Sequence, residues 1–143
     1  MLGLRPSTTG IYSLQPSFKK VPKYANHVTI PKVFSLNGYK TSTLGKIYHG
    51  APPKGEFDKM GTKVPLPNRF PNEKLVKTPQ NHKLVDWGIW PPKDSDQLDY
   101  KTADWAVNEL SQKPKDPFFM AVGFFRPHVP LYACLLYTSP SPR

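Results

Sequence analysis

Cysteine is almost absent from this sequence, since Cys134 is the only one among 143 residues. A single thiol cannot form a disulfide within the chain or supply a cluster of thiolate ligands to a metal ion. The sequence also has no apolar run near the roughly 18 residues that a membrane-spanning helix needs. Residues 1–7 lack the apolar segment of a signal peptide. The sequence therefore predicts no membrane span, and it does not indicate a compartment.

Dense clusters of basic residues are also lacking, although the chain is basic. It has 20 Lys and Arg against 10 Asp and Glu, for a formal net charge of +10. This balance favours an anionic substrate or partner through long-range attraction. The basic residues occur singly or in pairs, as at Lys19 and Lys20, and no aromatic RNA-binding motif accompanies them. The pattern is typical of a solvated basic surface and argues against nucleic-acid binding.

Proline is twice as frequent as glycine in this sequence, with 18 prolines against 9 glycines. Residues 51–92 have almost no apolar periodicity. Irregular loops longer than about 15 residues are uncommon in compact domains. So much irregular chain needs a larger scaffold, and the sequence therefore indicates an incomplete domain.

The first regular elements are predicted between residues 29 and 45. Thr29 is expected to cap a short helix over residues 30–36 that ends at Gly38. Residues 39–44 then have the pattern of a strand that runs into Gly45. The residues expected on one face of this strand are Tyr39, Thr41 and Thr43.

A second helix and a second strand are predicted further along. The helix spans residues 96–111, with acidic residues at its start and Pro114 beyond its end. Its apolar residues at helical spacing are Leu98, Ala103, Ala106, Val107 and Leu110. Residues 118–125 form a nearly continuous apolar run, which is typical of a strand buried on both faces. The order of these elements predicts an α/β layer structure.

Ligand sites in open α/β sheets lie beyond the carboxyl ends of strands. Two segments occupy such places here, GKIYHG at residues 45–50 and RPHVP at residues 126–130. Lys46 and His49 share one side if their segment makes a helical turn. His128 lies between two prolines that restrict the backbone, so its imidazole is aimed at low entropic cost. These cation-capable side chains predict an oxyanion site.

On the residues alone a plainer interpretation also stands. A histidine that follows a strand is commonly a hydrogen-bonded turn residue, and an isolated lysine is commonly solvated. His128 and Lys46 fit that description as well as they fit a site. The sequence motifs around them bear on the choice.

Three segments resemble the sulfatase family, in the order in which that family has them. GYKTSTLGKIYH, residues 38–49, resembles the second sulfatase signature, although Leu44 stands where a smaller or β-branched residue is more common. GLRPSTTGIY, residues 3–12, resembles the end of the first signature. PFFMAVGFFRPHVPLY, residues 117–132, resembles the strand and histidine loop of iduronate-2-sulfatase-like members. The resemblance implies a partial alkaline-phosphatase-like α/β domain of the arylsulfatase type, with an incomplete sheet and long irregular loops.

The resemblance also implies a mechanism and its residues. In this family a cysteine or serine becomes formylglycine, whose hydrate attacks the sulfur of a sulfate ester while calcium and cationic side chains hold the sulfate oxygens. Lys46 and His49 match the residues that contact formylglycine and sulfate. His128 matches the histidine that binds the sulfate or assists the leaving oxygen. The expected catalytic and substrate-binding residues are therefore Lys46, His49 and His128, with no metal ligand among them.

By the same resemblance, parts of the active site are expected outside this chain. The Cys-x-Pro-Ser-Arg nucleophile core and an aspartate pair for calcium would precede the chain, and later metal ligands would follow it. We therefore expect residues 1–133 to be a partial catalytic domain that does not hydrolyse sulfate esters alone. CLLYTSPSPR, residues 134–143, resembles a translated sequencing-adapter read-through more than a natural segment, with a loose Ser- and Pro-rich tail as the alternative. Cys134 is expected to have no function.

The expected substrate is a sulfated small molecule or glycan, to which the basic surface would be attracted. Trp87 and Trp90 can stack on a sugar ring or pack the loop that carries them. Two other functions fit the residues, a phosphoester hydrolase of the same superfamily and a non-catalytic binder of glycans or polyanions. A binder does not need Lys46, His49 and His128 to converge, so their positions in space distinguish it from an enzyme.

Overall fold

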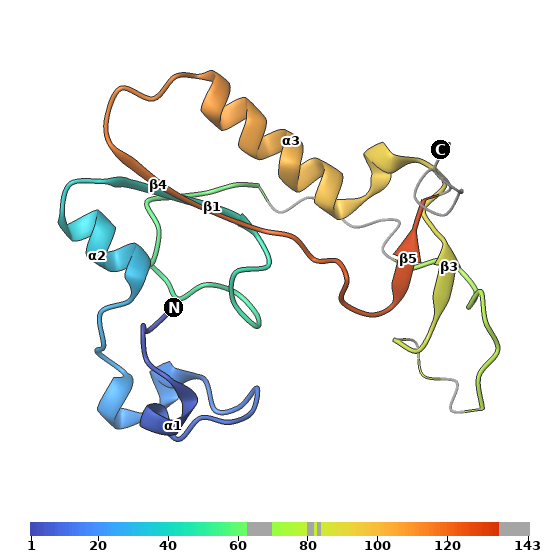
Figure 1. Cartoon of the computed structure of the whole chain (residues 1–143), viewed down its shortest axis with the longest axis horizontal. Helices are drawn as coiled ribbons and strands as arrows, with labels where there is room; N and C mark the ends of the chain where they lie inside the picture. The colour runs from blue at the N-terminus through green and yellow to red at the C-terminus, as the bar shows by residue number, and fades with distance from the viewer. Residues whose placement is uncertain (63–69, 80–81, 83, 135–143) are drawn as a thin grey trace, which may run out of the picture.

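A computed structural model of the chain describes residues 1–62, 70–79, 82 and 84–134 (Figure 1). The strands are β1 (Lys40–Gly45), β2 (Lys59–Met60), β3 (Trp87–Ile89), β4 (Phe118–Gly123) and β5 (Leu131–Ala133). The helices are α1 (Pro6–Thr9), α2 (Ile30–Leu36) and α3 (Leu98–Ser111), with 3-10 turns at Phe18–Lys20, Pro22–Tyr24 and Asp94–Asp96. Helices packed with parallel strands confirm the predicted α/β class.

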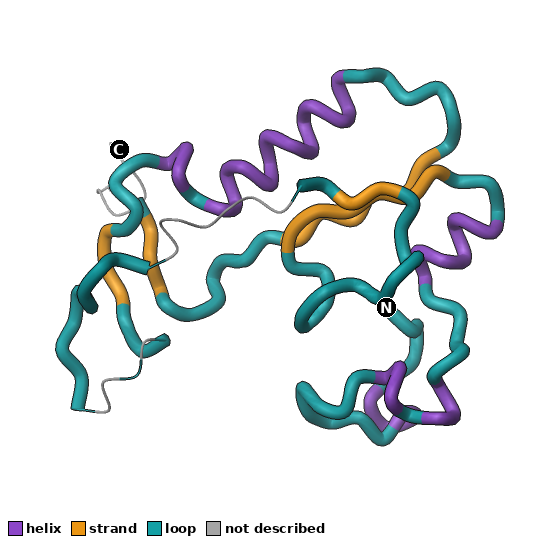
Figure 2. Tube along the Cα trace, turned by 180° about the vertical axis from the view of Figure 1, so that it is seen from behind, coloured by secondary structure: helices purple, strands orange, loops and turns teal. Residues whose placement is uncertain are grey.

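All strand pairs in the described part of the chain are parallel. One sheet has the order β2-β1-β4 and the other pairs β3 with β5. Figure 2 shows the two sheets as separate groups of strands, joined by the segment between β4 and β5. The register of β1 and β4 runs from Lys40 opposite Phe118 to Gly45 opposite Gly123. The carboxyl ends of these two strands therefore coincide.

Helix α2 covers one face of the three-stranded sheet, and its predicted bounds are confirmed. Phe34 of this helix stacks on Phe119 of β4, with ring centroids 4.4 Å apart. The expectation that the Thr29 side chain caps α2 is wrong, because it makes no capping hydrogen bond. Pro31 lies in the first turn and has no N–H, so one of the donors that such a cap usually meets is missing.

The predicted face of β1 is confirmed. Thr41 and Thr43 are buried, while Tyr39 just before the strand is half-buried and packs edge-on against Phe34. The Thr43 hydroxyl donates to the Ala121 carbonyl oxygen at 2.9 Å, so the buried hydroxyl is satisfied by the neighbouring strand. Buried and more exposed side chains therefore alternate along β1, as the sequence predicts.

Helix α3 lies on the other side of the strands (Figure 1), and its core contact is a threonine. Thr102 has 0% exposure, whereas Val107 and Leu110 of the predicted apolar stripe are 60% and 49% exposed. Figure 1 shows the helix diverging from the strands towards its carboxyl end. This divergence explains why the carboxyl-terminal half of the stripe is not buried as predicted.

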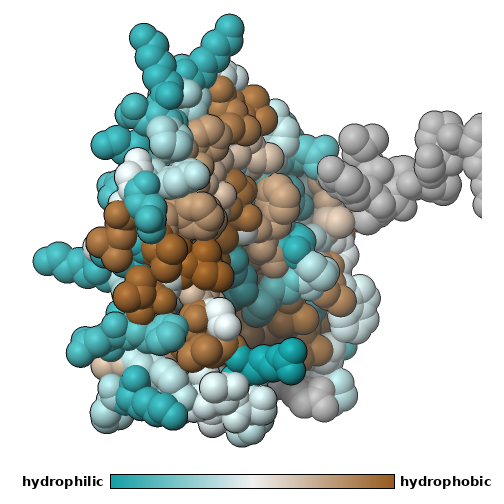
Figure 3. Space-filling model, turned by 60° about the vertical axis from the view of Figure 1, so that its left-hand side comes forward, coloured by the Kyte–Doolittle hydropathy of each residue, from teal (hydrophilic) through white to brown (hydrophobic). Residues whose placement is uncertain are grey.

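The prediction that residues 118–125 form a strand buried on both faces is wrong. β4 ends at Gly123, Phe118 is 40% exposed, and Phe124 beyond the strand is 56% exposed. β4 is the last strand of its sheet in the described part of the chain, and α3 covers it incompletely. Figure 3 accordingly shows apolar side chains at the surface on the side where α2 and the start of β4 lie.

The middle of the chain is irregular, as predicted. Between residues 51 and 92, the described stretches hold only the short strands β2 and β3, and residues 63–69, 80–81 and 83 lie outside the description. The expected tail is described only at Cys134, which is buried, so its proposed boundary stays a prediction. No helix within the described ranges is long and apolar enough to cross a membrane.

Candidate active site

The two loops with the predicted site residues begin side by side, because two glycines allow close approach. Gly45 has a φ of +89°, and a Cβ there would overlap the Gly123 carbonyl group. A Cβ on Gly123 would in turn overlap the Lys46 carbonyl group. The Lys46 N–H donates to the Gly123 carbonyl oxygen at 2.7 Å, which extends the strand pairing by one bond. The prediction that both loops leave one edge of the sheet is confirmed.

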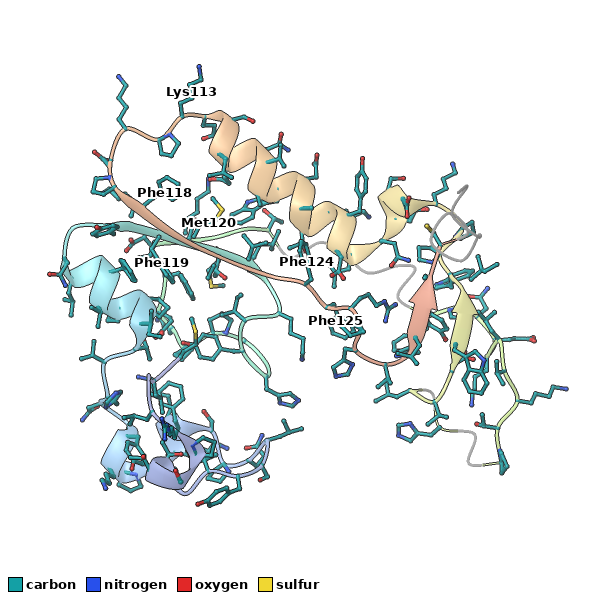
Figure 4. All side chains as sticks on the ribbon, in the orientation of Figure 1. Lys113, Phe118, Phe119, Met120, Phe124 and Phe125 are labelled. Carbon is teal, nitrogen blue, oxygen red and sulfur yellow. The ribbon has the colours of Figure 1, made fainter. Side chains whose placement is uncertain are left out.

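Lys46 and His128 meet at a shared aromatic ring. The Lys46 Nζ lies 5.5 Å from the centroid of the Phe125 ring. The imidazole of His128 packs on the same ring, with centroids 4.8 Å apart and planes tilted by 39°. Figure 4 labels Phe125 just beyond the end of β4, in the segment that leads towards β5. Two of the three predicted side chains, far apart in sequence, are thus brought to one place.

His49 is the exception. Residues 46–50 form bends, so the condition under which Lys46 and His49 would share one side, a helical turn, is not met. Gly45 turns the chain with its positive φ, and the Ile47 N–H donates back to the Gly45 carbonyl oxygen at 3.2 Å. His49 is exposed, and no hydrogen bond or ring contact among the described residues joins it to Lys46 or His128. Its convergence with the other two stays a prediction.

The imidazole of His128 is oriented by its own loop. The backbone N–H of His128 donates to the Phe125 carbonyl oxygen at 3.0 Å. Its Nδ1 lies 2.7 Å from the Val129 carbonyl oxygen. Because a carbonyl oxygen only accepts, Nδ1 carries a proton in this arrangement. Nε2 then accepts a hydrogen bond in the neutral ring and donates one in the protonated ring.

Arg126 stabilises the same loop from inside. Its Nη1 donates to the His128 carbonyl oxygen at 2.9 Å and also to the Pro130 carbonyl oxygen. The guanidinium carbon lies 5.6 Å from the centroid of the Tyr132 ring and 5.8 Å from that of Phe125. These contacts tie the two ends of residues 126–130 together and limit how far His128 can move.

Two carboxylates that hold this loop were not predicted. Asp99 of α3 accepts hydrogen bonds from the backbone N–H groups of Phe125 at 2.6 Å and Arg126 at 2.8 Å. In the sequence Asp99 indicated only a helix start. The partners lie 26 and 27 residues further along the chain, and no local pattern connects them.

Asp86 holds the other end of the loop. It is 2% exposed, accepts from the Tyr132 hydroxyl, and its backbone carbonyl oxygen accepts from the Leu131 N–H at 2.9 Å. Its carboxylate also accepts from the backbone N–H groups of Leu75, Val76 and Trp87 at 2.9–3.0 Å. Burial alone would raise the pKa of Asp86, but these hydrogen bonds outweigh it, and the pKa lies below its ordinary value.

The described residues offer no metal centre, because no three or more His, Cys, Asp and Glu among them are arranged to hold an ion. A cavity of about 450 Å³ lies at the opposite, amino ends of β1 and β4, where Figure 4 labels Lys113, Phe118 and Met120. It is remote from the loops described above and is not part of this site.

Parallel strands packed with helices, with a lysine and an oriented histidine just beyond two adjoining carboxyl ends, place this chain among the α/β proteins. A family model described as Sulfatase matches residues 1–142 of this chain. The chain therefore belongs to the sulfatase family.

Named relatives support this assignment and show how much of them the chain spans. A protein named Sulfatase from Formosa agariphila is 37% identical over 147 residues, which cover 92% of this chain and 29% of that protein. The iduronate 2-sulfatase of Homo sapiens is 28% identical, over 91% of this chain and 26% of its own length. The iduronate 2-sulfatase of Mus musculus is 32% identical, over 91% of this chain and 25% of its own length. The chain thus spans less than a third of these relatives.

Proposed function

We propose that this chain is part of a sulfuric ester hydrolase that acts on a sulfated small molecule or glycan. Membership of the sulfatase family supports the reaction class. The observation that carries the proposal is the meeting of Lys46 and His128 at Phe125, beyond the paired ends of β1 and β4. Lys46 and His128 lie far apart in the sequence, and their contacts with one ring at the paired strand ends support a shared anionic ligand.

In this proposal each side chain has a distinct role. The Lys46 ammonium attracts a sulfate oxygen, and charge stabilisation of this kind is usually a large part of catalysis. The protonated Nε2 of His128 binds sulfate or gives its proton to the ester oxygen as the sulfur–oxygen bond breaks. His49 contacts the sulfate and the nucleophile once the remaining active-site residues are present.

The proposal includes formylglycine and calcium, both held by parts of the protein outside this chain. Formylglycine supplies the attacking oxygen, and calcium supplies positive charge to the sulfate. With both groups in other parts of the protein, we expect the 143-residue chain alone to be inactive.

A sugar substrate is supported by three observations. The net charge of +10 attracts a polyanion. Trp87 is 50% exposed on β3, so its ring is available for stacking, whereas Trp90 is half-buried. Two of the relatives are named for a sulfatase activity on iduronate. We therefore propose a sulfated glycan as the natural substrate class.

The test uses the full-length protein that contains this sequence, assayed with a fluorogenic aryl sulfate and the matching aryl phosphate. We expect the sulfate to be preferred. Lys46→Met and His128→Gln should each lower kcat/KM by about 100-fold or more. Lys54→Met, at an exposed loop lysine, is the matched control and should stay within about twofold.

Four results would contradict the proposal. Preference for the phosphate would favour the phosphoester hydrolase. Turnover of neither ester, together with tight glycan binding, would favour a non-catalytic binder, and unchanged turnover in Lys46→Met would contradict the role given to that lysine. Turnover by the 143-residue chain itself, with a clean inactive control, would overturn its expected inactivity.

A further inference from the structure

The segment between β4 and β5 is attached at both ends by carboxylates. Asp99 accepts from the first two N–H groups after Phe124, those of Phe125 and Arg126. Asp86 binds Leu131 and Tyr132 at the far end. The two attachments differ, because Asp86 belongs to the middle of the chain and Asp99 to the first turn of α3.

Asp99 determines how the chain leaves β4. Its two carboxylate oxygens lie 2.6 and 2.8 Å from two successive backbone nitrogens. Hydrogen bonds to an ionised acceptor are stronger than those between neutral groups, and a pair of them also fixes direction. The orientation of the peptide at Phe125 is therefore set by a helix that is itself packed on Gly45 through Thr102, whose Cγ2 lies 3.1 Å from a Cβ built on that glycine.

Phe125 connects Asp99 to both predicted cations, His128 and Lys46. The Phe125 carbonyl oxygen accepts the His128 N–H, and its ring contacts the imidazole. The same ring also contacts the Lys46 ammonium, 5.5 Å from its centroid. A shift of Phe125 would therefore move His128 relative to Lys46 and change the geometry of the site.

We propose that Asp99 is a positioning residue of the sulfate site, which holds the His128 imidazole in place relative to Lys46. This inference rests on the function proposed above for Lys46 and His128. Asp99 does not touch the substrate and acts only through Phe125, Arg126 and the histidine loop. Its effect should therefore disappear when His128 is replaced.

The helix offers a closely matched control. Asp99→Asn retains the size of the side chain but replaces one acceptor oxygen by an NH2 group, which would face a backbone N–H. Asp104 lies on the same helix and is exposed, and within the part of the chain that the structure describes it accepts only from the Asn108 side chain, at 3.2 Å. Asp104→Asn thus removes the same charge from α3 without touching the loop.

A first measurement needs no ligand. The imidazole nitrogen shifts of His128, recorded by NMR on the full-length protein with labelled histidine and with no substrate added, report which nitrogen carries the proton. We expect the Nδ1–H form in the parent protein and in Asp104→Asn. Asp99→Asn should shift the ratio towards the Nε2–H form, because the loop no longer holds Nδ1 against the Val129 carbonyl. A folded Asp99→Asn with the parent ratio would overturn the proposal.

A second measurement tests the link to catalysis in the full-length protein. Asp99→Asn should lower kcat/KM by about tenfold or more, since misplacement of a catalytic group by about an ångström is costly. In a His128→Gln background the same change should cost less than about twofold. An equal loss in both backgrounds would mean that Asp99 serves general stability, and would overturn the proposal.

The two measurements separate the two hypotheses. If the full-length protein hydrolyses no sulfate ester, the proposed function fails, and the imidazole shifts still decide the role of Asp99. If Asp99→Asn does not fold, Asp99→Glu replaces it, with both oxygens kept on a longer stem. We then expect a smaller shift in the same direction, and the parent ratio would overturn the proposal.

Discussion

The two loops that leave the sheet side by side differ in how they are held. The loop after β4 is attached by Asp99 at its start, by Arg126 within it and by Asp86 at its end. The loop after β1 is attached by the Lys46 N–H and by the Tyr48 hydroxyl, which donates to the buried Glu56 carboxylate at 2.6 Å. His128 is oriented by these contacts, whereas His49 is exposed.

This difference shows which part of the site is preorganised within the chain. Preorganisation requires that a side chain be limited before its ligand arrives. The loop after β4 meets that condition through partners that all lie in the described residues. The loop after β1 places Lys46 through the strand pairing, but it leaves the orientation of His49 to contacts beyond its own loop.

The largest expected effect comes from Asp86, the attachment at the end of the histidine loop. Asp86→Ala leaves buried N–H groups and the Tyr132 hydroxyl without their acceptor, so we expect a loss of about 3–4 kcal/mol in the free energy of unfolding. Urea unfolding followed by tryptophan fluorescence measures it, because Trp87 lies next to Asp86. Asp104→Ala is the control and should change stability by less than about 0.5 kcal/mol. A loss below about 1 kcal/mol in Asp86→Ala would mean that water replaces the carboxylate.

The second prediction concerns Gly45, the residue at which the loop after β1 leaves the sheet beside the loop after β4. Gly45→Ala adds a clash with Gly123 to the strain of a positive φ, and should cost roughly 2–3 kcal/mol. Gly50, at the end of the loop after β1, also has a positive φ of +109°, but a Cβ there would have no atom within 4 Å. Gly50→Ala should therefore cost only about 1 kcal/mol. Equal losses in urea unfolding would show that strain alone matters and that close approach does not.

The two histidines should differ in stability in the absence of any ligand. His128→Gln removes the Nδ1 hydrogen bond and the contact with Phe125, and should cost about 1 kcal/mol. His49→Gln, at an exposed position, should stay within about 0.5 kcal/mol of the parent chain. Thermal unfolding of the two variants side by side tests this directly. A larger loss for His49→Gln would reverse the comparison between the loops.

The smallest expected effect is on stability in acid, and it concerns Asp58, the residue just before β2. The backbone N–H of Thr41, and then its hydroxyl, donate to the Asp58 carboxylate and hold its pKa below its ordinary value. A lowered folded pKa gives stability that is present above the unfolded pKa and is lost as pH falls through the folded value. We expect Asp58→Asn to flatten the fall in stability below about pH 4, and Asp104→Asn to leave it steep. Urea unfolding at a series of acidic pH values distinguishes the two.

Local patterns in the sequence predicted those elements that depend on neighbouring residues. The bounds of α2 follow from a proline in its first turn and a glycine after its end, and the buried face of β1 follows from alternation. The meeting of the two loops followed from one general rule, that the carboxyl ends of parallel strands coincide. Lys46 and His128 were brought together by that rule.

What the sequence did not predict depends on distant partners. β3 and β5 have three residues each, too few to show a period, and they pair across more than 40 residues of chain. The donors that bind the carboxylates of Asp86 and Asp99 have no local signature, because any aspartate near a helix start or a turn looks the same. The apolar run of β4 indicated a strand correctly, but its composition does not reveal whether a further strand or helix covers it.

The hydrogen bond from His128 to the carbonyl oxygen of Val129 has a consequence for anyone who compares related sequences. That oxygen belongs to the main chain, and every amino acid at position 129 would present it. The determinant of which imidazole nitrogen faces the ligand is therefore invisible to alignment and to side-chain scanning. Replacing that carbonyl oxygen by sulfur, as in a thioamide, weakens the acceptor and changes no side chain, and is the modification that would expose it.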